Sequence, residues 1–334
     1  MRLSEIGEFG LIARVAQGLL THPGEVVAGA GDDAAVLRLP GPHWLLFTTD
    51  MLVEGVHFSL AWATYEQVGY KTVAVNASDI AAMGGWPTHG VISLGLPPRV
   101  SVEEVEALYH GLRRAAAEYR LNIVGGDTVA SPERLVINFA LLGLVEAGLA
   151  VLRGGARVGD LICVTGTLGN SAAGLYLCQN PGLAPDGETA AFLYRAHLEP
   201  RAKLAAGRLL ASAGATAMED VSDGLARELH NICRASGVGC LVRAKDVPLS
   251  SQARELARLA GCDPLEWALS GGEDYELVFT LPEDLFEQAK EELAAIGESC
   301  TCIGEIIPPQ EGLLLELPDG KRVPLALQGY DHFA

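Results

Sequence analysis

Thr64-Tyr-Glu-Gln-Val-Gly-Tyr-Lys-Thr-Val-Ala-Val-Asn-Ala-Ser-Asp-Ile-Ala-Ala-Met83 is the stretch from which both the fold and the site of this chain can be worked out. At about 100° per residue, four of its side chains fall within about 40° of one direction, which predicts a helix over residues 64–83: Val68, Thr72, Val75 and Asp79. Asp79 therefore shares the apolar stripe of this helix. An unpaired carboxylate there is costly, and the nearest basic residue, Lys71, lies two turns away. We expect Asp79 to be paired, protonated or bound to a divalent cation.

Strands and a second helix are expected on both sides of this helix. Ser101 and Glu104 form a capping-box pattern that predicts a helix to about residue 119. Helical spacing also recurs over residues 9–20. Strand-like runs are found at residues 36–39, 44–49, 91–96, 121–124 and 135–145. The first half is therefore predicted to be an α+β, ferredoxin-like domain.

Gly154-Gly-Ala-Arg-Val-Gly159 is the best candidate for a domain boundary, and 334 residues suffice for two domains. We predict one domain over residues 1–150 and a second, α/β-type domain over residues 151–334. Alternating strands and helices are expected in the second domain, with helices after Gly169 and from Pro200. Further strands are expected at residues 161–165, 239–243 and 275–281, and further helices at 222–236 and 283–296.

The charge balance narrows the possible partners. Lys and Arg number 24 against 42 Asp and Glu, a formal net charge of -18, which argues against nucleic acid or an anionic membrane surface. Phosphate ligands are compatible only if cations lie between them and the carboxylates. We expect no membrane span, since no apolar run reaches the required length. The seven cysteines form no CxxC pair, which favours reduced thiols in a cytoplasmic protein.

Several aspartates stand out because small or apolar residues surround them. They lie at the ends of strand-like runs or at a helix start: Asp32, Asp33, Asp50, Asp127, Asp220 and Asp223. With nearby hydroxyls they form a hard-oxygen ligand set that suits Mg²⁺, Mn²⁺ or Ca²⁺, and no EF-hand loop is present. The sequence also lacks a P-loop, a GxGxxG motif after an early strand, kinase signatures and GxSxG. The residues alone indicate a Mg²⁺-dependent enzyme that acts on phosphates.

At these same segments the chain resembles the thiamine-monophosphate kinases, a family of the superfamily that includes aminoimidazole ribonucleotide synthetase. The matching pieces follow one another along nearly the whole chain: Gly7-Glu-Phe-Gly-Leu-Ile, Gly31-Asp-Asp-Ala-Ala-Val, Thr48-Thr-Asp-Met-Leu-Val-Glu-Gly-Val-His57-Phe, Ala74-Val-Asn-Ala-Ser-Asp-Ile-Ala-Ala-Met-Gly84, Gly125-Gly-Asp-Thr, Leu152-Arg-Gly-Gly-Ala, Asp220-Val-Ser-Asp-Gly-Leu, Ser270-Gly-Gly-Glu-Asp-Tyr-Glu-Leu and Gly329-Tyr-Asp-His-Phe.

The resemblance implies ATP-dependent phosphorylation of thiamine monophosphate to thiamine diphosphate. It also implies a homodimer whose N-terminal sheets join into a β-barrel. It assigns Mg²⁺ binding, with several ions, to these residues: Asp33, Thr48, Thr49, Asp50, Asp79, Asp127, Asp220 and Asp223. It assigns contacts with ATP to Tyr109, Gly126, Asp127, Arg153 and Ser222. It assigns contacts with thiamine monophosphate to His57, Tyr330 and either Glu273 or Asp274.

Alternatives remain for single residues and for the whole chain. Without the resemblance, a capping or packing role is favoured for His57 and anchoring of the chain end for Tyr330, and Arg153 is equally consistent with an interdomain ion pair. Aminoimidazole ribonucleotide synthetase is the rival enzyme, and a non-catalytic Mg-nucleotide-binding protein is the rival from another class. For the kinase we expect direct transfer without a covalent enzyme intermediate or a dedicated base, because the acceptor phosphate is already anionic at neutral pH.

Overall fold

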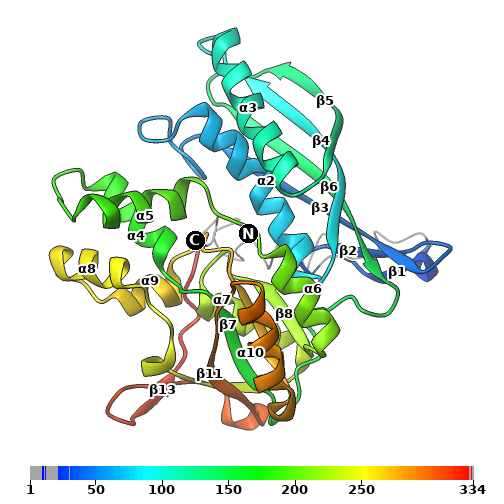
Figure 1. The fold of residues 1–334 in the computed structure, drawn as a ribbon, viewed down its shortest axis with the longest axis vertical. Coiled ribbons are helices and arrows are strands. Elements are labelled where there is room, and N and C mark those ends of the chain that lie inside the picture. The colour runs from blue at the N-terminus through cyan, green and yellow to red at the C-terminus, as the bar shows by residue number, and fades with distance from the viewer. Residues whose placement is uncertain (1–9, 11, 13–21, 30, 331, 333–334) are drawn as a thin grey trace.

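The computed structural model describes residues 10, 12, 22–29, 31–330 and 332. It contains two sheets, each with helices packed against it, one at the upper right of Figure 1 and one in its lower part. The helix predicted over residues 9–20 falls almost entirely outside the described residues. The two-domain expectation thus rests on residues from Val26 onward.

The first sheet has six strands in the order β1-β2-β3-β6-β4-β5. The strands are β1 (Val26–Ala28), β2 (Ala35–Arg38), β3 (His43–Val53), β4 (Trp86–Leu96), β5 (Asn122–Ala130) and β6 (Val136–Glu146). Strands β3 and β6 pair antiparallel along their whole length, from His43 opposite Glu146 to Val53 opposite Val136. This long pairing holds the residues from Thr48 to Asp50 in the middle of the sheet.

Two helices, α2 (Tyr65–Ala82) and α3 (Val102–Glu118), cover one face of this sheet (Figure 1). Both begin with a full capping box, which at α3 is the predicted pair of Ser101 and Glu104. The helices approach so closely that a Cβ on Gly69 would lie 2.0 Å from the main-chain oxygen of Leu108. Helix α2 is therefore packed between α3 and the sheet, and most of its residues are buried.

The expected two-domain mixed fold is confirmed, with one refinement in the first domain. Its elements follow the order β3–α2–β4–α3–β5–β6, and β4 pairs parallel with β5. A ferredoxin-like sheet would be antiparallel throughout, but here α3 is a crossover between two parallel neighbours. Strand β5 becomes the edge strand, far from β3.

The second sheet has seven strands in the order β13-β12-β9-β11-β7-β10-β8. They are β7 (Leu161–Thr165), β8 (Ala217–Asp220), β9 (Gly239–Arg243), β10 (Leu277–Leu281), β11 (Cys300–Ile307), β12 (Leu313–Glu316) and β13 (Arg322–Pro324). The helices of this half are α4 (Asn170–Gln179), α5 (Gly187–Leu198), α6 (Leu204–Ala213), α7 (Leu225–Ser236), α8 (Ser251–Ala260), α9 (Pro264–Ser270) and α10 (Phe286–Ala295). The predicted boundary at residues 150 and 151 falls in the segment between β6 and β7.

Two predicted helix starts are wrong. The helix expected from Pro200 begins only at Leu204, after four residues without regular structure, and the helix expected over residues 222–236 begins at Leu225. Helix α6 packs closely against the C-terminal part of α2, where a Cβ on Gly207 would lie 2.0 Å from the main-chain oxygen of Ala81. Helix α2 thus contacts both halves of the chain, which places Asp79 between them.

Two further expectations concern the thiols and the membrane. All seven cysteines are free, as expected. Among the described residues, no helix combines the length and the apolar character needed to cross a membrane.

Candidate active site

A large cavity, of about 1430 Å³, receives residues from both halves of the chain. Most of the predicted site residues line it: Asp33, Thr48, Thr49, Asp50, His57, Asp79, Arg153, Ser222, Asp223, Glu273 and Tyr330. The structure therefore brings together residues that are more than 200 positions apart in the sequence. The geometry divides them into an acidic centre, its basic neighbour and a second group further along the wall.

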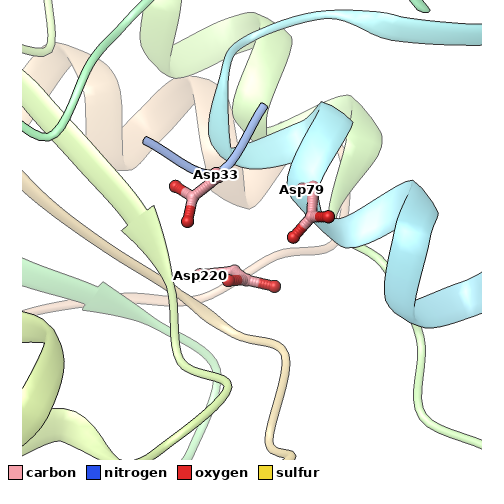
Figure 2. Close-up of side chains that lie close together, drawn as sticks. All are labelled: Asp33, Asp79 and Asp220. Carbon is pink, nitrogen blue, oxygen red and sulfur yellow. The ribbon is translucent and has the colours of Figure 1, made fainter. Parts of the chain in front are cut away.

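The acidic centre consists of Asp33, Asp79 and Asp220, each of which offers one carboxylate oxygen within 4.8 Å of the others. Figure 2 shows the three carboxylates around a common space, from three different parts of the fold. Asp33 lies in the loop before β2, Asp79 in the last turns of α2, and Asp220 at the end of β8. We call these residues the three-aspartate cluster.

The cluster has the properties of a cation site. Oδ2 of Asp33 and Oδ2 of Asp220 are buried and have no hydrogen-bond partner among the described residues. Burial, and then the charge of Asp50, raises the pKa of Asp79 well above its usual range. Burial, and then Asp33, does the same to the pKa of Asp220. Buried carboxylates that repel one another and leave oxygens unpaired fit a hard divalent cation such as Mg²⁺.

Strand β3 contributes consecutive residues that point to opposite faces of the sheet. The Thr48 hydroxyl donates to Oδ2 of Asp79, so Thr48 belongs to the acidic centre. Asp50 lies on the same face, its amide donates to Asn76 Oδ1 at 3.0 Å, and burial followed by Asp33 raises its pKa to about 6. Thr49 points to the outer face, where Asn138 Nδ2 donates to its hydroxyl at 2.8 Å.

Arg153 is the basic neighbour of the cluster. Its guanidinium lies 2.5 Å from Asp33 Oδ1 and 2.8 Å from Glu219 Oε1, so it pairs with two buried carboxylates. Its amide also donates to Asp32 Oδ1 at 3.1 Å. The pKa of Asp32 is raised to about 6, chiefly by burial and then by Asp33.

Two buried glutamates near the site were not predicted. Glu219 reaches Arg153, and Glu228 Oε1 accepts the amide of Asp223 at 2.8 Å. Asn231 Nδ2 donates to both carboxylates, at 3.0 and 3.2 Å. Glu219 could have been found from its position beside Asp220 in a short buried strand. Acidic residues at both positions, however, remove the apolar pattern by which such a strand is predicted.

The second group lies along the wall and contains His57 and Glu273. His57 Nδ1 accepts the amide of Val53 at 3.0 Å, and burial followed by His332 lowers the pKa of the imidazole. His332 lies between two predicted contacts, 4.9 Å from the His57 ring and 4.8 Å from the Tyr330 ring. Glu273 opens into the cavity and pairs with Lys71 at 2.7 Å.

Asp274 has a different environment from Glu273. Its carboxylate accepts the amides of Gly169 at 2.5 Å and Ser171 at 3.0 Å, at the start of α4, and it is not among the cavity-lining residues. Helix α4 has Gly169 at its N-cap, without a side-chain cap of its own. Asp274 therefore supplies that cap from elsewhere in the chain.

Tyr109, Gly126 and Asp127 lie away from the cavity. Asp127 is on β5, in register with Ser93, Asn138 and Met51 across β4, β6 and β3. Three strand spacings of about 4.8 Å put it roughly 14 Å from β3. Tyr109 is on α3 and packs against the core of the first domain. Within one chain, these residues do not join the three-aspartate cluster.

Comparison with known proteins agrees with this arrangement. The family AIR synthase related protein, N-terminal domain, matches residues 31–145, and its C-terminal domain matches residues 157–314. The chain is 37% identical over 332 residues to the thiamine-monophosphate kinase of Bacillus subtilis (strain 168), covering 98% of this chain and 99% of the relative. The chain belongs to the thiamine-monophosphate kinase family.

Other members of the kinase family show the same extent of likeness. The thiamine-monophosphate kinase of Escherichia coli (strain K12) is 39% identical over 329 residues, or 98% of each chain. A solved structure described as AaThiL complexed with AMPPCP and TMP has a TM-score of 0.87 and 37% identity, covering 100% of this chain and 99% of that chain. Both domains, and the cavity between them, are thus within the matched length.

Proposed function

We propose that this chain is a thiamine-monophosphate kinase, which transfers the terminal phosphoryl group of ATP to the phosphate of thiamine monophosphate. The observation that carries the proposal is the cavity that Asp33 and Asp79 of the three-aspartate cluster line together with Glu273, with the Asp220 carboxylate within 4.8 Å of the two aspartates. Relatives with this name match the chain over nearly its whole length. A related structure is described with AMPPCP and TMP together, the pair of ligands that such a cavity must hold.

The acidic centre is the proposed Mg²⁺ site. Its proposed ligands are the three-aspartate cluster and two residues on the same face of β3, Thr48 and Asp50. Thr49 and Asp223 lie at the margins of this site. Bound Mg²⁺ would neutralise charge on the phosphoryl group that is transferred. Arg153 and Ser222 lie next to these ligands and are the proposed contacts for the phosphates of ATP.

The acceptor needs positioning more than activation. Its phosphate is already anionic near neutral pH, so no residue has to remove a proton from it. We propose direct transfer, without a phosphorylated enzyme and without a general base. His57, Glu273 and Tyr330 are the proposed contacts for thiamine monophosphate, and Glu273 is favoured over Asp274 because Asp274 caps α4.

A homodimer would complete the site. The outer face of the first sheet exposes large apolar side chains: Phe47, Met51, Val91 and Val129. Thr49 and Asp127 share that face by strand register, although they lie three strands apart. Two sheets joined through this face, as in the expected β-barrel, would bring Asp127, Gly126 and Tyr109 of one protomer toward the Thr49 side of the other. Light scattering of the purified protein would give twice the mass of the chain, whereas a monomer would contradict this part of the proposal.

Phosphorus NMR tests the reaction itself. With ATP, Mg²⁺ and thiamine monophosphate, we expect thiamine diphosphate and an equal amount of ADP. Asp220→Asn should bind nucleotide weakly and form no product, which controls for contaminating kinases. If ATP stays intact in the presence of folded wild-type protein, the kinase proposal is wrong, and binding of nucleotide without turnover would then favour a non-catalytic protein.

A further inference from the structure

Part of the cavity wall is a cluster of ionisable side chains, distinct from the three-aspartate cluster. Lys71 Nζ lies 2.7 Å from Glu273 Oε1, and His197 Nδ1 lies 3.3 Å from Glu273 Oε2. The Lys71 ammonium also donates to the main-chain oxygen of His197 at 3.3 Å. The side chains of Lys71 and His197 are each 4% exposed, whereas Glu273 keeps 25%. All three residues line the cavity, and the carboxylate is the most exposed of them.

This cluster lies at a defined distance from the acidic centre. Lys71 and Asp79 belong to the same helix, α2, and are eight positions apart. At about 1.5 Å per residue this separates them by roughly 12 Å along the helix axis. If phosphoryl transfer takes place at Asp79, Glu273 lies at the distance of the rings of the acceptor and not of its phosphate.

The backbone around Glu273 is held in an unusual conformation. Glu273 has a φ of 67° and Tyr275 a φ of 53°, in the left-handed region that non-glycine residues seldom adopt. Their amides donate to the main-chain oxygens of Ser222 at 2.7 Å and Val221 at 3.0 Å. Such conformations persist only where the surroundings hold them. The main-chain oxygens of Val221 and Ser222 hold the backbone of this loop, and Lys71 holds the side chain of Glu273.

We propose that Lys71 and His197 are positioning residues for the acceptor, which fix the Glu273 carboxylate as the anion that receives the cationic ring end of thiamine monophosphate. This inference rests on the proposed kinase function. The thiazolium ring carries a permanent positive charge, and the aminopyrimidine ring carries hydrogen-bond donors, so a fixed carboxylate complements both. Tyr176 and Trp267 line the same cavity with ring centroids 5.5 Å apart, and they offer aromatic faces to a flat cation.

The electrostatics of the cluster support separate tasks for its two basic residues. Burial acts to raise the pKa of Glu273, but its basic neighbours, Lys71 first among them, lower the pKa overall. Burial, and then Lys71, lowers the pKa of His197 to about 4, so its imidazole is neutral at pH 7. Lys71 therefore supplies the charge that keeps Glu273 ionised. His197 Nδ1 is hydrogen-bonded to the Ser171 hydroxyl at 3.1 Å and lies 3.3 Å from the second oxygen of Glu273.

The test uses thiamine, which has the rings of the substrate but no phosphate. In titration calorimetry with the full-length protein, Lys71→Met should weaken thiamine binding by on the order of 30-fold, because without the ammonium the buried Glu273 takes up a proton and loses the charge that attracts the ring. Binding of Mg²⁺ with AMPPCP should change by less than about twofold. In the kinase assay, the same variant should raise KM for thiamine monophosphate while KM for ATP stays near the wild-type value. An unchanged affinity for thiamine, or an equal loss for both ligands, would overturn the proposal.

Lys203→Met is the matched control. Lys203 is also a largely buried lysine, paired with Glu276 at 3.2 Å and Glu298 at 2.8 Å, but it does not line the cavity. The Lys203→Met substitution should lower the melting temperature without a selective loss of affinity for thiamine. Glu273→Gln and His197→Asn provide the test if Lys71→Met does not fold.

A double variant separates an indirect from a direct role of Lys71. If Lys71 acts through Glu273, Lys71→Met combined with Glu273→Gln should bind thiamine as weakly as Glu273→Gln alone. Additive losses would show a direct contact and contradict the positioning role. The binding measurements need no turnover, so a wild-type protein that binds thiamine but forms no thiamine diphosphate would refute the kinase function and leave this cluster testable.

Discussion

Replacement of Asp79 by Asn should make the metal-free protein more stable and remove most of its stabilisation by Mg²⁺ with nucleotide. Asn keeps an oxygen that can accept the Thr48 hydroxyl, which now donates to Oδ2 of Asp79. Its amide group adds donors next to Asp33 and Asp220, whose Oδ2 atoms lack hydrogen-bond partners among the described residues. The substitution therefore relieves repulsion and satisfies orphaned acceptors at nearly constant volume.

The size of the effect follows from the geometry. Two full charges 4.8 Å apart, the upper limit within the cluster, repel by about 3.5 kcal/mol at an effective dielectric constant of about 20. Proton uptake limits the real cost, since the pKa values of Asp79 and Asp220 are both raised by burial and by neighbouring carboxylates. A net gain of about 2–3 kcal/mol is expected near pH 7.5. At about 2.1 cal/mol/K of unfolding entropy per residue, this raises the melting temperature by roughly 3–4 °C.

Calorimetry in chelator and in excess Mg²⁺ with AMPPCP measures both effects. Wild-type protein should show a large upward shift on addition of the ligands, and Asp79→Asn should show little. Asp284→Asn, at an exposed position, is the matched control and should change neither value by more than about 0.5 kcal/mol. A variant that is less stable than wild type in chelator, or that keeps the full ligand shift, would refute the assignment of Asp79 to a cation site.

Three more outcomes test other parts of the site. The pKa values of Asp32 and Asp50 are raised to about 6, so the folded protein binds these protons more tightly than the unfolded chain does. The free energy of unfolding of the metal-free protein should therefore fall as pH rises from about 4 to 6, by up to about 3 kcal/mol per group. A flat pH profile in thermal denaturation would contradict this. Mixing inactive Asp79→Asn and Asp127→Asn subunits should restore about one quarter of the activity if Asp127 acts across the dimer, and none if each chain forms a complete site. Asp274→Ala should cost about 1–2 kcal/mol of stability through the α4 cap, as denaturant unfolding would show, with KM for thiamine monophosphate nearly unchanged.

Local patterns in the sequence predicted the first domain well. The apolar spacing around Val68 and the Ser101 capping box predicted two helices that the structure confirms, the second of them with its predicted cap. The helix placed at Pro200 was wrong because proline favours a first turn without requiring one, and the chain here first crosses from α5 to α6. Strand β8 was missed because only four residues form it and two of them are acidic, so it lacks the apolar signature of a buried strand.

The candidate site shows where local reasoning ends. Embedded aspartates predicted a cation site, and three of them meet within 4.8 Å. Lys71 was considered only as a partner of Asp79 because both lie on one helix, yet its partner is Glu273, in a loop roughly 200 residues away. Neither burial nor pairing over such separations leaves a periodic trace in the sequence. Glu273 and Asp274 are neighbours in the sequence, yet Glu273 lines the cavity while Asp274 accepts the amides at the start of α4, a difference set by the backbone fold around them.

The cavity, like the whole chain, has more acidic than basic residues. Of the described cavity-lining residues, only Lys71 and Arg153 are lysine or arginine, and each is already paired: Lys71 with Glu273, Arg153 with Asp33 and Glu219. Neither offers an uncompensated positive charge to a phosphate. Arg153 can turn toward a nucleotide only if another cation takes its place beside Asp33, which is also a member of the three-aspartate cluster. Cation binding at the cluster would thus supply positive charge for the phosphates and release the arginine at the same time, so nucleotide affinity should depend on Mg²⁺ more steeply than simple chelation by ATP requires.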